Sequence, residues 1–151
     1  MGPKAATYAG RFGDALITIS TPSRCKDVIF PGFEEGARIA GKNPADMEKM
    51  ALVCYGIGEE ASLMQRLKGG DAAFLADKAF DEPDPRRVQA MAATVEDDRI
   101  RQNFQLCRSA DDLIPVVESY VSVGANQVVF GTGACPELIK QIGERVIPSF
   151  R

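Results

Sequence analysis

The 151-residue sequence contains no histidine and no tryptophan. Without histidine, the chain cannot supply a Ser–His–Asp triad, an imidazole general base or most catalytic zinc sites. Proton transfer within the chain is left to carboxylates, tyrosine, lysine, cysteine, water or a cofactor. The cysteines, at positions 25, 54, 107 and 135, form no C-x-x-C pair. We therefore predict no metal site.

Long apolar runs and an excess of basic charge are missing as well. No segment approaches the ~20 apolar residues that span a bilayer, and Met1-Gly2-Pro3 does not begin a secretion signal. The formal net charge is −3, which favours neither nucleic acid nor an anionic membrane as a partner. We expect a cytoplasmic protein that acts on a small-molecule substrate.

Apolar strands alternate with helices along the chain. Residues 15–20, 50–55 and 127–131 are almost continuously apolar, as expected of strands that are buried on both faces. Helical patterns lie between them, so the order predicts βαβ units and a parallel sheet in an α/β fold. Three such strands do not close an α/β domain by themselves.

Capping residues, apolar spacing and glycine stops define the helices between these strands. Pro31 and Gly32 are expected to interrupt the second helix. Ser109 is a predicted N-cap with Asp112 in the capping-box position, and Pro115 implies either a kink or a later helix start. The predicted helical segments are 3–12, 25–40, 59–68, 86–91 and 109–123, followed by one from 136.

Residues 71–108 depart from the simple alternation, and we predict an inserted helical lobe there. The run Asp81-Glu82-Pro83-Asp84-Pro85 breaks the chain, and its Asp84 is a candidate N-cap. Ile100, Phe104 and Leu106 continue a charged helical stretch. Such an insertion either caps a pocket or is purely structural, and its amino-acid composition does not indicate a ligand.

The opening residues form a local pattern that suits an anion. Gly2 and Pro3 begin a helix, and Pro3 fits the first helical position. Backbone N–H groups at a helix start point outward and favour phosphate or carboxylate, and Gly2 leaves room for the ligand. An ordinary connection without a ligand is the alternative.

Two other loops follow predicted strands. The helix from Pro136 gives a second place for an anion or a ring edge, with a plain turn as the alternative. Gly56-Ile57-Gly58 is interpreted as a strand-to-helix turn, because no third glycine completes a nucleotide fingerprint.

Several segments resemble the bacterial luciferase-like family, which includes flavin monooxygenases and oxidoreductases dependent on the deazaflavin coenzyme F420. They are Gly2-Pro3-Lys4, the helix end Ala9-Gly10-Arg11-Phe12-Gly13-Asp14 and the strand Ala15-Leu16-Ile17-Thr18-Ile19. The ending, residues 124–130 and then 142–148, is similar to the closing strand and helix of methylenetetrahydromethanopterin reductases.

This resemblance implies that the whole chain, 1–151, is the C-terminal part of a (β/α)8 TIM barrel. The expected fold is a partial TIM barrel with the last three parallel strands, helices and the inserted lobe 71–108. The resemblance assigns the cofactor phosphate to Gly2, Pro3 and Lys4, with F420 as the cofactor and FMN as the alternative.

The substrate is expected at the carboxyl ends of the strands, where barrel enzymes keep their chemistry. Candidate substrate-binding residues are Ser20 and Thr21 after the first strand, and Gly131 and Thr132 after the third. Catalytic residues stay unassigned, because the family places them on the first strands, which this sequence does not include.

The implied activity is hydride transfer between reduced F420 and a one-carbon pterin carrier. Another F420- or FMN-dependent oxidoreductase, including the sugar-phosphate dehydrogenases, is an alternative within the family. Against a sugar phosphate, Pro22 and Gln102 stand where that type has lysines, although Arg24 and Arg101 lie near them in sequence. The alternative from a different functional class is that the chain is a non-catalytic subunit.

A barrel sector leaves sheet edges and apolar faces open. We therefore expect the isolated chain to be inactive. The same exposure predicts that it is held by the missing barrel half, by a partner chain or by self-association as a homo-oligomer.

Overall fold

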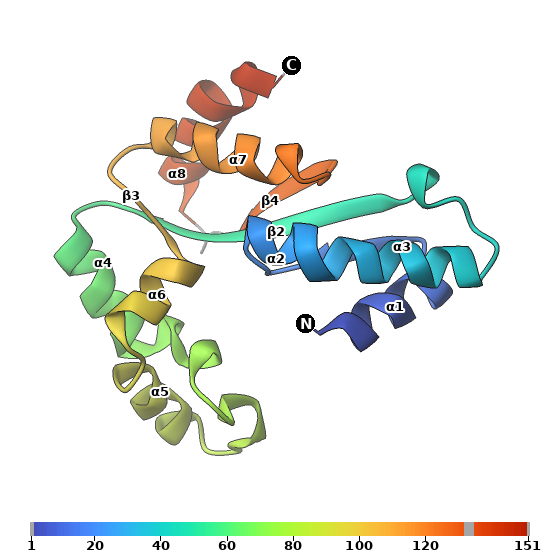
Figure 1. Ribbon diagram of the computed structural model, residues 1–151. Coiled ribbons are helices and arrows are strands. Elements are labelled where there is room, and N and C mark those ends of the chain that lie inside the picture. The colour runs from blue at the N-terminus through green and yellow to red at the C-terminus, as the bar shows by residue number, and fades with distance from the viewer. Residues whose placement is uncertain (1, 132–134, 151) are drawn as a thin grey trace.

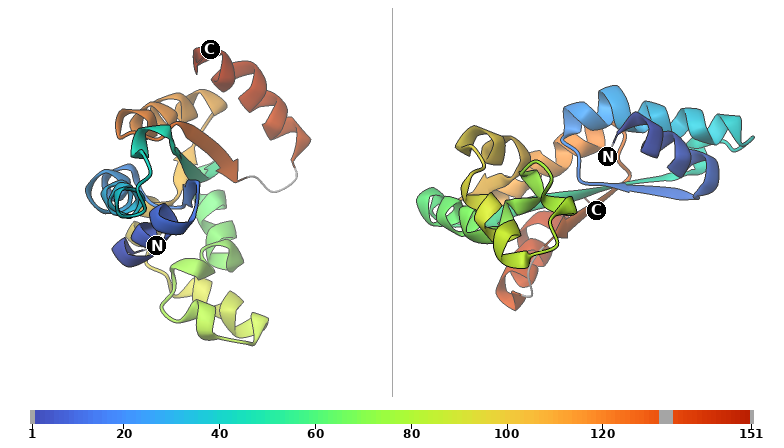
Figure 2. Two further views of the ribbon diagram at one scale, coloured as in Figure 1. Left: turned by 90° about the vertical axis from the view of Figure 1, so that its right-hand side faces the viewer. Right: turned by 90° about the horizontal axis from the view of Figure 1, so that it is seen from below.

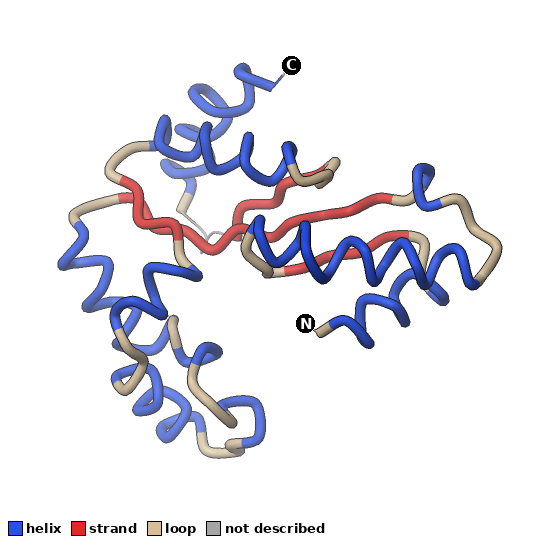
Figure 3. Tube along the Cα trace, in the orientation of Figure 1, coloured by secondary structure: helices blue, strands red, loops and turns tan. Residues whose placement is uncertain are grey.

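The computed structural model describes residues 2–131 and 135–150, and these contain four parallel strands. The strands are β1 (Ala15–Thr18), β2 (Glu48–Ile57), β3 (Gln105–Cys107) and β4 (Gln127–Gly131). β2 pairs with each of the other three, and all pairings are parallel. Figure 3 shows the strands in the middle of the molecule with helices around them. The predicted parallel α/β arrangement is confirmed.

The structure has one strand more than the three predicted. Helix α6 (Asp97–Asn103) ends before Phe104, and Gln105–Cys107 then pair with Tyr55–Ile57 of β2. The expectation that Phe104 and Leu106 continue a helix is therefore wrong. The error arises because positions 100 and 104 have the spacing of a helix, and because a three-residue strand is too short to show apolar–polar alternation.

Helix α1 (Pro3–Phe12) has the predicted limits. The second helical stretch is continuous through α2 (Pro22–Arg24), a π-helical turn (Cys25–Ile29) and α3 (Phe30–Ile39). Pro31 does not interrupt it, which corrects the prediction. The widened π-helical turn directly before α3 accommodates the missing N–H of Pro31 in the first turn of α3.

The predicted caps of later helices are confirmed. The Asp84 carboxylate accepts a hydrogen bond from the Arg86 N–H, and Ser109 and Asp112 form a capping box. The α-helix after Ser109 begins only at Leu113, so Pro115 lies in its first turn. The remaining helices are α4 (Glu60–Arg66), α5 (Pro85–Ala93), α7 (Leu113–Ser122) and α8 (Pro136–Gln141). Within the described ranges, no helix has the length and apolar character needed to cross a bilayer.

One face of the sheet is covered by helices and the other is open. Burial along β1 alternates, with Leu16 and Thr18 inside and Ile17 55% exposed, and Ile19, just after the strand, is also 55% exposed. The prediction that this strand is buried on both faces is therefore wrong. On the covered face the core contains Leu16, Ala51, Val53 and Tyr55 of the sheet with Ile29, Phe33, Leu113, Val117 and Tyr120 of the helices.

Residues 60–103, here called the helical segment, have a hydrophobic core of their own. Figures 1 and 2 show it beyond the carboxyl end of β2, away from α1 and α3. Arg101 ties its last helix to its first through Glu60, with 3.0 Å between Nε and Oε1. Its core, continued by Phe104, contains Met64, Leu67, Ala72, Leu75, Val95 and Ile100. The segment thus forms a wall beside the edge of the sheet where β2 and β4 end.

Candidate functional site

A pocket of about 610 Å³ lies where β2 and β4 end and the helical segment begins. Carboxyl ends of parallel strands are where α/β barrels place their active sites. We therefore take this pocket as the candidate functional site. Among the described residues, the lining is Cys54, Tyr55, Gly56, Ile57, Arg66, Leu67, Asp71, Phe74, Phe104, Gly131, Cys135 and Leu138.

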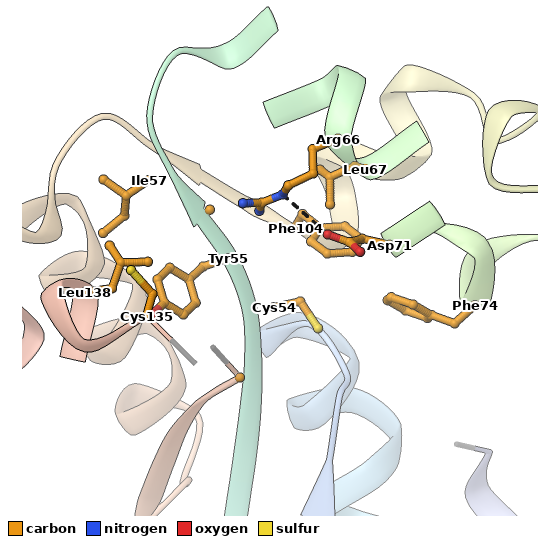
Figure 4. Close-up of a pocket in the computed structure, with 12 residues that line it drawn as sticks. Cys54, Tyr55, Ile57, Arg66, Leu67, Asp71, Phe74, Phe104, Cys135 and Leu138 are labelled. Carbon is orange, nitrogen blue, oxygen red and sulfur yellow. Dashed lines mark ion pairs between the residues drawn. The ribbon is translucent and has the colours of Figure 1, made fainter. Parts of the chain in front are cut away.

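β2 divides the lining into two groups, because successive side chains of a strand point to opposite faces. In Figure 4, Tyr55 and Ile57 lie on one side of the strand with Cys135 and Leu138 of the α8 region. Cys54 lies on the other side, with the side chains of the helical segment. The pocket therefore wraps around the end of β2.

A single ion pair supplies the charge in this lining. The Nε of Arg66 lies 3.4 Å from Oδ2 of Asp71, and both side chains are more than half exposed. Gly56 makes room for Leu63 and for the guanidinium, since a β-carbon at that position would lie 2.9 Å from the Leu63 Cδ2 and 3.2 Å from the Arg66 Nη2. Arg66 thus lies across the end of β2 and faces the pocket with its charge offset by Asp71.

Aromatic and sulfur groups form the rest of the wall on this side. The rings of Phe74 and Phe104 are 5.6 Å apart between centroids and tilted by 49°. Cys54 is half-buried, and burial raises the pKa of its thiol. The thiol is therefore protonated near neutral pH and acts as a small apolar group. This wall suits an apolar or planar ligand.

Tyr55 carries a buried hydroxyl for which the described residues offer no hydrogen-bond partner. The side chain is 7% exposed, and its ring meets Phe130 edge to face at 5.4 Å between centroids. Burial is the main cause that raises the pKa of this hydroxyl. Tyr55 therefore stays neutral and keeps a proton to donate. Within the same residues, no cluster of acidic and cysteine side chains could hold a metal ion.

The residues predicted to hold a cofactor phosphate lie at the start of α1. Gly2 is the N-cap, with extended backbone (φ −111°, ψ 173°), and a β-carbon there would meet no described atom within 4 Å. Pro3 occupies the first helical turn, and Lys4 is exposed. No side chain of the described part caps this helix start. The N–H groups of the first turn therefore have no side-chain acceptor among the described residues.

Ser20 and Thr21, predicted to bind substrate, lie after β1 in different settings. Ser20 is 7% exposed, and its hydroxyl accepts a hydrogen bond from the Thr18 hydroxyl at 3.0 Å. Its carbonyl accepts one from the Tyr120 hydroxyl at 3.1 Å. Ser20 thus points into the covered side of the sheet, whereas Thr21 is half-buried and begins α2.

Gly131 ends β4, pairs with Cys54 of β2 and lines the pocket. Thr132 lies outside the described residues. Sequence reasoning missed Arg66, Asp71, Phe74 and the other pocket residues of the helical segment. The available signal was Cys54-Tyr55-Gly56, which end the second strand as Gly131 ends the last.

The chain is similar to parts of known enzymes. It is 29% identical over 133 residues to an F420-dependent glucose-6-phosphate dehydrogenase of Mycolicibacterium gilvum (strain PYR-GCK), which covers 85% of this chain and 40% of that protein. A solved F420-dependent secondary alcohol dehydrogenase, in complex with an F420-acetone adduct, shares 35% identity with a TM-score of 0.88. That match covers all of this chain and 47% of the other. The chain is a homologue of the F420-dependent, luciferase-like oxidoreductases.

The same comparisons confirm the fold class, a sector of a TIM barrel. The F420-dependent tetrahydromethanopterin reductase from Methanopyrus kandleri superposes with a TM-score of 0.73 at 22% identity, over 99% of this chain and 49% of that one. At this identity the likeness concerns the fold alone. No family model matches the sequence. The chain spans about half the length of these F420-dependent relatives.

Proposed function

We propose that the protein to which this chain contributes transfers a hydride between coenzyme F420 and an organic substrate. The observation that carries the proposal is the 35% identity, over the whole chain, to an enzyme solved with an F420-acetone adduct. F420 supplies the hydride chemistry when bound, and the protein supplies binding, orientation and exclusion of water. FMN is the alternative cofactor.

The residues of this chain fit such a cofactor at two places. The start of α1 offers uncapped N–H groups beside Gly2, where the backbone is open to a phosphate. Phe74 and Phe104 offer an aromatic wall for a planar ring at the carboxyl edge of the sheet. In this proposal Gly2, Pro3 and Lys4 hold the phosphate, and Lys4 adds a solvent-screened positive charge.

The resemblance of the closing strand and helix to methylenetetrahydromethanopterin reductases favours a one-carbon pterin carrier as substrate. The solved secondary alcohol dehydrogenase favours a secondary alcohol or ketone. The named glucose-6-phosphate dehydrogenases favour a sugar phosphate. Against the sugar phosphate, Arg101, beside the position where a phosphate-binding lysine is expected, is paired with Glu60, Asp97 and Asp98.

Absorbance titration of the complete protein with F420 and with FMN tests the cofactor. We expect saturable binding of F420, followed by F420-dependent turnover of one of the three substrate classes. Binding of FMN without binding of F420 would overturn the cofactor assignment. Binding of neither would favour the non-catalytic alternative, in which the chain is a structural subunit.

A further inference from the structure

The charged side chains that line the pocket at the ends of β2 and β4 bear on the charge of the substrate that this pocket can bind. Among the described residues that line it, Arg66 and Asp71 are the only charged side chains, and they lie against each other at 3.4 Å. The other lining residues are apolar, aromatic, sulfur-containing or glycine, apart from the neutral Tyr55. The cationic side chain of this described lining, Arg66, is thus already paired with the carboxylate of Asp71.

The fold fixes this pair at the mouth of the pocket. Arg66 ends α4, and Asp71 ends the π-helical turn Leu67–Asp71 that follows. Leu67, between them, is buried in the core of the helical segment and anchors the turn. On the opposite side, Gly56 of β2 leaves space for both Leu63 and the guanidinium. The packed turn therefore places the two charges beside each other, while both side chains stay more than half exposed.

We propose that the Arg66–Asp71 pair makes this pocket selective for an uncharged, largely apolar alcohol or ketone, and selects against phosphorylated substrates. The proposal rests on the F420-dependent activity proposed above. A phosphate would have to displace Asp71 from Arg66 and then lie beside the displaced carboxylate, so like-charge repulsion opposes it. A neutral substrate leaves the pair intact.

The direct test is Asp71→Asn in the complete protein, because it leaves Arg66 in place without its counter-charge. We expect the ratio of kcat/KM for glucose-6-phosphate to kcat/KM for 2-propanol to rise at least about tenfold, the scale of one charge-assisted contact. The double variant Arg66→Gln/Asp71→Asn should lose this gain. Asp77→Asn is the matched control, since it removes a carboxylate of the same segment that pairs with Arg99 at 3.4 Å and does not line the pocket.

A second measurement needs no cofactor. Isothermal titration calorimetry with glucose-6-phosphate should detect binding to Asp71→Asn and none to the unmodified protein or to Asp77→Asn. With F420 added, the unmodified protein should turn over 2-propanol with a higher kcat/KM than glucose-6-phosphate.

The outcomes separate this inference from the proposed function. An unchanged substrate ratio in Asp71→Asn, preference of the unmodified protein for glucose-6-phosphate, or turnover confined to a one-carbon pterin carrier would each overturn the substrate class while F420 binding stands. Failure of the unmodified protein to bind F420 would overturn both.

Discussion

Gly10 of α1 lies directly against the carbonyl group of Phe33 in α3. A β-carbon at Gly10 would fall 1.9 Å from that oxygen, and one at Gly36 would fall 2.0 Å from the carbonyl oxygen of Thr7. The two helices are therefore in backbone contact, and both atoms that a side chain would strike belong to the main chain. Because Gly2 is the N-cap of α1, this contact also influences where Gly2 lies.

We expect Gly10→Ala to destabilise the fold by about 1–3 kcal/mol, since overpacking a close contact forces the helices apart. Gly143→Ala is the matched control. Gly143 is also helical, but a β-carbon there meets no described atom within 4 Å, so the substitution should stabilise by about 0.5–1 kcal/mol through helix propensity. Urea unfolding measures whether each substitution lowers or raises the free energy of unfolding. Equal effects would contradict the close packing.

Two buried tyrosines should respond differently to loss of the hydroxyl. Tyr120 donates a hydrogen bond to the Ser20 carbonyl, and burial raises its pKa to about 12. Tyr120→Phe should therefore cost about 1–2 kcal/mol. Tyr55→Phe should be neutral or stabilising, because the described residues give its hydroxyl no partner. The free energy of unfolding of each variant decides this, and a larger loss for Tyr55→Phe would show that its hydroxyl has a partner.

The start of α1 is expected to affect cofactor affinity more than stability. Gly2→Val in the complete protein should weaken F420 binding by about 1–3 kcal/mol, because the side chain fills the approach to the N–H groups. Extended backbone and open space at Gly2 predict little change in the melting temperature without cofactor. Lys4→Ala should weaken binding less, and its effect should fade with salt.

Two measurements on the Gly2→Val variant distinguish a role of Gly2 in cofactor binding from a role in fold stability. They are titration with F420 and thermal melting without cofactor. A large melting shift with unchanged affinity would remove Gly2 from the site.

The open sheet face predicts self-association of the isolated chain. Ile17 and Ile19, each 55% exposed, lie on this face. Native mass spectrometry should show oligomers of the chain, and Ile17→Ser/Ile19→Ser should shift them toward monomer with little loss of stability. Ile39→Ser serves as a control, because Ile39 is similarly exposed at the end of α3. A compact monomer of the unmodified chain at all concentrations would contradict the expectation.

Features set by neighbouring residues could be predicted from the sequence, whereas those set by distant contacts could not. The caps at Asp84 and Ser109 depend on groups two or three residues away, and both were predicted correctly. β3 depends on pairing with β2 and has no alternation of its own, so it was missed.

The residues of the candidate site also divide into those that a local pattern indicates and those that only distant contacts bring together. Gly131 was found because it ends an apolar strand. Phe74 and Phe104, thirty residues apart in the sequence, meet only because the helical segment folds around its own core. The burial of Ser20 likewise depends on Tyr120 of a distant helix, which no local pattern indicates.

β2 is the strand through which every pairing of the described sheet passes. β1 pairs with its first residues, β4 with its middle and β3 with its end, so no two of the outer strands pair directly. Each outer strand therefore depends on β2 alone for its ladder hydrogen bonds within the described sheet. A substitution that distorts β2, such as a proline at one of its paired positions, would therefore loosen the other three strands together.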